Sequence, residues 1–142
     1  MVDEIADALE RWHEEGYSCL VVILGGDGED EVVRMFSTIE PPNVLNLALG
    51  VAKVLATLLK GGGATDDGAL LVKGAGGTEE MVGDMTARLR GDAVVVAGLT
   101  DESCSVYVRG SVADLMYACM RVTVTMEKVD PAVSLRDGLS MN

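Results

Sequence analysis

The chain has 142 residues, of which 49% are hydrophobic, and a formal net charge of −12. This length suits one ordinary domain or two very small ones, and it allows a sizeable core. Because aromatic residues are scarce, we expect that core to consist of Leu, Val, Ala and Met. A chain this acidic does not bind a phosphate backbone through counterion release, so direct nucleic-acid binding is excluded.

The negative charge is concentrated in the first part of the chain. Residues 1–40 carry eleven acidic and two basic residues, net −9, whereas residues 41–142 carry twelve and nine, net −3. This acidity keeps an apolar domain in solution. It also suits contact with a basic protein surface, including one that normally holds nucleic acid.

The sequence begins with an acidic amphipathic segment rather than a signal peptide. Ile5, Ala8, Leu9 and Trp12 follow the spacing i, i+3, i+4 and i+7, which predicts a helix. Apolar and alternating residues then predict strands over 18–25 and 31–37.

The two predicted strands flank the motif Gly25-Gly26-Asp27-Gly28. This motif resembles the glycine-rich signature of NAD kinase and diacylglycerol kinase folds, which would imply a phosphate-binding loop. The resemblance covers four residues, and the acidic residues that follow would repel a phosphate. Since an alternating strand pattern comes next, and Asp-Gly favours hairpin turns, we interpret the motif as a turn.

Residues 43–60 are apolar nearly all round and predict a helix that is buried on most faces. This run is interrupted by Asn46 and Lys53 and is too short to span a bilayer comfortably. Residues 61–77 are rich in glycine and predict a linker, with a possible short strand at 69–73. A glycine loop at 74–78 lacks the residues of a P-loop.

The second half of the chain repeats the pattern of the first. It predicts a helix from Thr78, strands over 92–99 and 105–110, and a last helix over 111–127. Offsets of 74 residues for the strands and 68 for the helices align the two halves. In this alignment Leu20 matches Val94 and Val44 matches Val112.

Two parts of the second half carry weaker signals. The β-branched residues at 122–125 also fit a strand, although the repeat favours a helix there. Residues 128–142 show no strong pattern and predict a flexible tail. The expected organisation is a first unit at 1–60, a linker at 61–77, a second unit at 78–127 and a tail at 128–142.

The sequence offers no catalytic or metal-binding set. His13 is the only histidine, so it forms neither a nucleophile–base pair nor a zinc site with other histidines. An odd number of cysteines without CxxC spacing is typical of buried thiols in a reducing, cytoplasmic environment. They are Cys19, Cys104 and Cys119. We therefore expect no enzymatic activity, no metal and no cofactor.

One carboxylate cluster lies between the first two predicted strands. It lacks the spacing of a calcium loop and is interpreted as a solvated hairpin tip. As a set of negative charges it is also a candidate contact for a basic partner. Its members are Asp27, Glu29, Asp30 and Glu31.

These patterns predict an α+β fold made of two αββα units in tandem. We expect one four-stranded antiparallel sheet with helices packed against it, and a homo-oligomer, with a C2 dimer favoured, that buries the remaining apolar surface. The favoured function is a non-enzymatic interaction or assembly module. A sharper form of it is an inhibitor or mimic that occupies a basic protein groove, as some phage proteins do. The alternative is a small-ligand-binding domain or modest enzyme with a site between the units.

Overall fold

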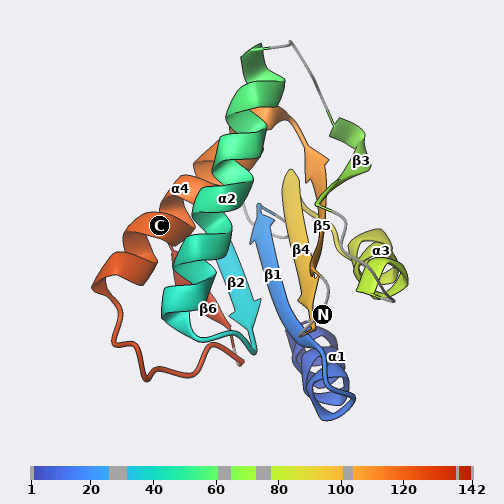
Figure 1. Cartoon of the computed structure of the whole chain (residues 1–142), viewed down its shortest axis with the longest axis vertical. Helices are drawn as coiled ribbons and strands as arrows, with labels where there is room; N and C mark the ends of the chain where they lie inside the picture. Colours follow the sequence, from blue (N-terminus) through green and yellow to red (C-terminus); the bar gives the residue numbers. More distant parts are fainter. Residues whose placement is uncertain are drawn as a thin grey trace.

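The computed structural model describes residues 2–25, 32–60, 65–72, 78–100, 104–136 and 138–141. Within these residues, four α-helices and six strands form an α+β architecture around one antiparallel sheet (Figure 1). The helices are α1 (Val2–Glu14), α2 (Pro41–Lys60), α3 (Thr78–Arg88) and α4 (Val112–Lys128). The strands are β1 (Ser18–Leu24), β2 (Val33–Ser37), β3 (Thr65–Val72), β4 (Ala93–Leu99), β5 (Cys104–Gly110) and β6 (Leu139–Met141).

The two expected hairpins lie in one sheet. Its strand order is β3-β5-β4-β1-β2-β6, and every neighbouring pair is antiparallel. The pairs β1/β2 and β4/β5 are the hairpins, and β1 joins β4 at the centre, with Val22 opposite Val95. The predicted four strands are therefore too few, because β3 and β6 extend the sheet at its two edges.

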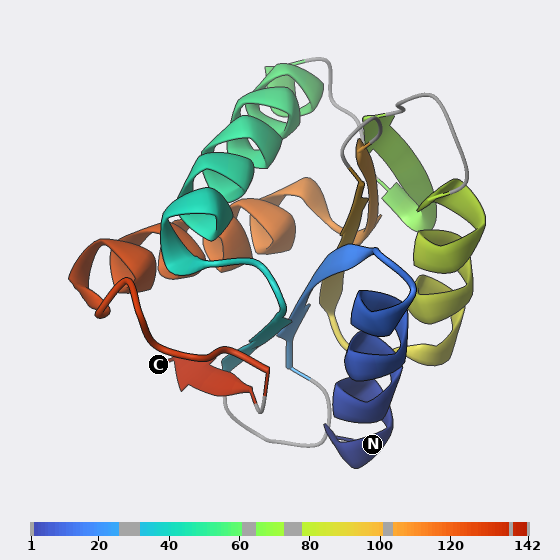
Figure 2. The ribbon, with the colours of Figure 1, turned by 60° about the horizontal axis from the view of Figure 1, so that its bottom comes forward.

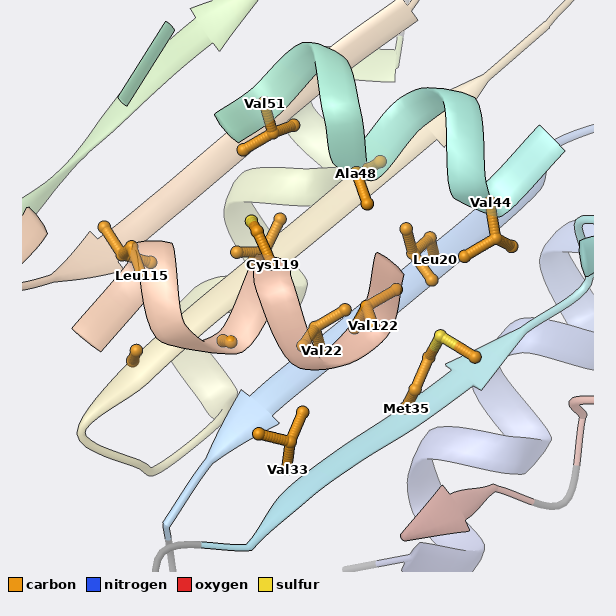
Figure 3. Close-up of a cluster of buried hydrophobic side chains, with 14 of the residues drawn as sticks. Leu20, Val22, Val33, Met35, Val44, Ala48, Val51, Leu115, Cys119 and Val122 are labelled. Carbon is orange, nitrogen blue, oxygen red and sulfur yellow. The ribbon is translucent and has the colours of Figure 1, made fainter. Parts of the chain in front are cut away.

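Helices cover both faces of the sheet (Figure 2). Side chains alternate along a strand, so Leu20 and Val22 pack under α2 and α4, whereas Val21 and Ile23 pack under α1 and α3. On the first face, α2 and α4 pack against each other and share one core with the sheet (Figure 3). Both faces of β1 are buried, which explains its uninterrupted apolar sequence.

The pairing of the strands corrects the predicted alignment of the two hairpins. A shift of 73 residues carries the pair Leu20–Ser37 onto Ala93–Gly110. It also carries the pair at the other end of the hairpin, Leu24 and Val33, onto paired residues. The predicted shift of 74 would place Leu20 on Val94, which faces the opposite helix layer. A slip of one residue exchanges the two faces of a strand, so the shift of 74 is wrong.

The helix alignment is corrected in the same way. A shift of 71 residues superimposes the starts of α2 and α4 and the buried positions along them. The predicted shift of 68 instead places exposed Gly50 on buried Ala118. The matched buried pairs are Val44 with Leu115, Ala48 with Cys119, Val51 with Val122 and Leu55 with Met126. Residues 122–127 are helical, so the competing strand interpretation is wrong.

The predicted linker at 61–77 and the predicted flexible tail at 128–142 each contribute a strand to the sheet. In the predicted linker, β3 is longer than the short strand considered at 69–73, and it pairs with β5 through an irregular register. In the predicted tail, β6 pairs with β2, and Leu135 and Met141 are buried. Backbone pairing and burial therefore tie the C-terminal segment to the sheet edge.

Candidate interaction surfaces

The predicted carboxylate cluster lies outside the described residues. Asp27, Glu29, Asp30 and Glu31 all fall between Gly25 and Val32. The residues on either side are described: the Gly25 N–H donates to the Val32 carbonyl at 3.1 Å, and Gly25 has φ +82°. The glycine-rich motif therefore connects two antiparallel strands and not a strand and a helix, which is the connection a phosphate site would use.

The three cysteines have pKa values above the ordinary value of a thiol. Burial raises the pKa of Cys19 and of Cys119 to about 12, and it also raises the pKa of Cys104. His13 is exposed near the end of α1. In the described part of the chain, no three His, Cys, Asp or Glu residues lie together so that they could hold a metal ion.

The first candidate surface is the outer side of the α2 and α4 layer, which we call the α2–α4 surface. Met120 is 59% exposed, Leu49 43%, Val124 39% and Tyr117 37%. Tyr117, Met120 and Val124 are spaced i, i+3 and i+7, so they form a stripe along α4 opposite its buried side. Met120 and Leu49 occupy equivalent positions under the shift of 71.

The stripe on α4 is not evident from the sequence patterns. The apolar run at 44–59 gives a stronger signal, and the alternation at 122–125 favours a strand at the end of α4. One feature of the sequence does point to an exposed stripe, because α4 carries apolar residues at more positions than packing against one sheet face requires. Which of these positions faces outward depends on how the helix is rotated against the sheet, and periodicity alone does not settle that rotation.

A cavity of about 410 Å³ borders this stripe, and we call it the Arg121 pocket. The Arg121 Nε is buried and has no hydrogen-bond partner within the described residues. The remaining lining is mainly apolar, with one further cation. The pocket is formed by Arg121, Val124, Thr125, Lys128, Val129 and Leu139. Because most of this lining is apolar, the pocket is suited to an apolar group.

The second candidate surface lies on the opposite face, between α1 and α3. These helices do not pack closely against each other as α2 and α4 do, and a groove of about 390 Å³ separates them. Ile5, Ala8, Met85 and Leu89 line the groove, together with charged Glu4, Asp7, Arg11 and Arg88. We call this the α1–α3 groove.

Charge is segregated across the sheet. Helices α1 and α3 together contain eight acidic and two basic residues, net −6. Helices α2 and α4 contain two acidic and four basic residues, net +2. Half of the net charge of −12 is therefore on α1 and α3, and the apolar stripe lies on the side where charge is sparse.

A third cavity, of about 610 Å³, lies beside the start of α2. Its wall mixes polar and apolar side chains, and the polar ones include Ser18, Thr38, Asn43 and Asn46. The helix start does not offer it a phosphate site. Pro41 and Pro42 have no N–H, and the next two N–H groups donate to the Glu40 carbonyl.

The comparisons with known proteins add no family to this description. The sequence matches no protein-family model, and a search of curated proteins finds no significant match. None of the described helices has the length and apolar character needed to cross a bilayer.

Proposed function

We propose that this chain is a non-enzymatic assembly module that self-associates through the α2–α4 surface. The observation that carries the proposal is the exposed stripe of Tyr117, Met120 and Val124 on a helix whose other side is fully engaged in the core. Contiguous exposed apolar side chains of this kind favour burial against another protein surface. Fully burying an exposed large apolar side chain contributes about 1.5–3 kcal/mol, and these partly exposed side chains would each contribute a fraction of that.

The charge distribution supports a second copy as the occupant. Two chains that each carry a net charge of −12 repel one another over most of their surfaces. This repulsion is weakest where the α2 and α4 layers meet, because each of those layers has a net charge of +2. A closed C2 dimer would use the same patch on both copies and leave both acidic layers outermost.

We also propose that the chain arose as a tandem repeat of an αββα unit. The hairpin registers coincide under a shift of 73 residues, and the buried positions of α2 and α4 coincide under a shift of 71. Under the first shift Val22 corresponds to Val95, its own pairing partner, which is expected at a local twofold axis. Such a repeat presents two similar helices, α2 and α4, side by side on one face.

Native mass spectrometry and light scattering across a concentration series test self-association. We expect a dimer, and we expect Met120→Glu to weaken it about a hundredfold, because the change removes apolar area and adds a charge on both copies. Ala87→Glu is the matched control, since it adds the same charge to an exposed site on α3, in the opposite layer. A wild-type chain that stays monomeric would overturn the proposal, as would equal weakening by both variants.

The segregated charge favours a second candidate function. The acidic α1 and α3 layer would bind a basic protein surface, as an inhibitor or mimic that occupies a basic groove. The supporting observation is that α1 and α3, whose sequences carry net −6, lie across the sheet from the α2–α4 surface, so both contacts can form at once. This binding would depend strongly on ionic strength.

A further inference from the structure

The outer side of α4 is self-complementary when two copies run in opposite directions. Asp114, Arg121 and Lys128 repeat every seven residues, so they lie along one edge of the helix. Asp114 and Lys128 stand about 10 Å on either side of Arg121 along the helix axis. They carry opposite charges, and neither has an ion-pair partner among the described residues.

The apolar stripe shows the same arrangement. Tyr117 lies four residues before Arg121, and the Arg121 pocket opens around Val124 and Thr125, three and four residues after it. The exposed ring of Tyr117 and the Arg121 pocket therefore lie at nearly equal distances from Arg121, on opposite sides of it along the helix. If two copies of α4 pack antiparallel with Arg121 at the centre of the contact, the Tyr117 ring of each copy meets the Arg121 pocket of the other.

We propose that two copies of this chain dimerise through antiparallel α4 helices, with the twofold axis beside Arg121. Tyr117 inserts into the Arg121 pocket of the second copy, and Asp114 pairs with Lys128 of the partner subunit. This inference rests on the proposed self-association and assigns its register. The twofold axis makes every contact occur twice.

The lining of the Arg121 pocket supports this register. A tyrosine combines an apolar ring with a hydroxyl group, which matches a mainly apolar pocket that has Arg121 and Lys128 in its wall. The ring also presents its face to a guanidinium group, which is a favourable contact. The partner subunit's Tyr117 therefore suits both the apolar and the cationic parts of this wall.

A charge-exchange cycle tests the register. We expect Asp114→Lys and Lys128→Asp each to weaken the dimer about tenfold, because each places like charges together at two symmetric sites. The double variant restores both ion pairs in reversed orientation, so its dimer Kd should return to within about threefold of the wild-type value. Dissociation constants from native mass spectrometry and sedimentation provide the comparison.

Substitutions of Tyr117 test its insertion into the Arg121 pocket separately. Tyr117→Phe keeps the ring and should weaken the dimer about threefold through loss of the hydroxyl group, whereas Tyr117→Ala should weaken it about tenfold or more. Circular dichroism melts of each variant show whether it remains folded, since Asp114 and Lys128 also lie at opposite ends of the α4 dipole.

The outcomes distinguish a wrong register from a failure of the broader proposal that the chain self-associates. If the double charge variant is weaker than both single variants, or Tyr117→Ala dimerises normally, this register is wrong. If Met120→Glu still disrupts the dimer in that case, self-association through the α2–α4 surface remains supported. A wild-type chain that is monomeric at all concentrations overturns both.

Discussion

At the scale of single residues, burial determines the state of the thiols. Cys19 lies in β1 under the α1 and α3 layer, and Cys119 lies in α4 within the opposite core. A thiolate in either place would lose its hydration, which is why the pKa of each is raised to about 12. These cysteines behave as small apolar side chains that fill the core.

The raised pKa values predict a loss of stability in alkaline solution. The unfolded chain ionises its thiols near the ordinary cysteine pKa of 9.0, whereas the folded chain keeps these two protonated up to about 12. Their contribution is therefore complete below pH 9 and declines as the pH rises toward 12. We expect the urea midpoint of the wild-type chain to fall more steeply with pH than that of the double variant Cys19→Ala, Cys119→Ala. Parallel slopes would contradict this linkage.

At the scale of elements, α3 depends on a side chain from the neighbouring strand β5. The guanidinium of Arg109 donates to the Thr86 carbonyl at 2.9 Å and to the Leu89 carbonyl at 2.5 Å. These carbonyls lie at and just beyond the end of α3, where the helix dipole is negative, and the Thr86 carbonyl also accepts from the Leu89 N–H at 3.4 Å. Arg109 therefore both caps α3 and fastens it to the sheet.

Replacing this cap should cost measurable stability. We expect Arg109→Met to lower the free energy of unfolding by about 1–3 kcal/mol, because two carbonyl groups lose a charged donor. Chemical denaturation monitored by circular dichroism gives the value. Arg11→Met is the control, since Arg11 is exposed on α1 and its side chain makes no hydrogen bond within the described residues. A change below about 0.5 kcal/mol for Arg109→Met would show that the cap contributes little.

At the scale of the whole molecule, the sheet separates two surfaces of different chemistry. One helix layer is acidic and grooved, and the other is sparsely charged with an exposed apolar stripe. A dimer through the second layer would carry two acidic surfaces pointing away from each other. Such a particle could bridge or block two basic surfaces.

The acidic layer predicts salt-sensitive binding to a polycationic peptide, measured by calorimetry or fluorescence anisotropy. We expect the double variant Glu4→Gln, Asp7→Asn to weaken this binding about threefold or more and to reduce its dependence on salt. Glu127→Gln with Asp130→Asn removes the same charge from α4 and the segment after it, and should have a smaller effect. Equal losses would indicate that only total charge matters.

The sequence by itself determined the types of the main elements and their order. Period-two and helical spacing are local properties, so the hairpins and the helices could be predicted within a few residues of their observed bounds. The sequence also predicted that the two halves follow one plan, because apolar residues recur in the same classes. The carboxylates singled out as a contact lie outside the described residues and remain a prediction.

Only the tertiary structure decided the register of the two hairpins, the sheet edges and the exposed stripe. Leu20 and Val94 are both apolar in sequence, and only strand pairing shows that they face opposite layers. The edge strands β3 and β6 form through backbone bonds to distant partners, which their own sequences barely encode. Met120 is exposed because α4 packs another apolar side against the sheet. Which side of an apolar helix is buried depends on how all the elements pack around the core.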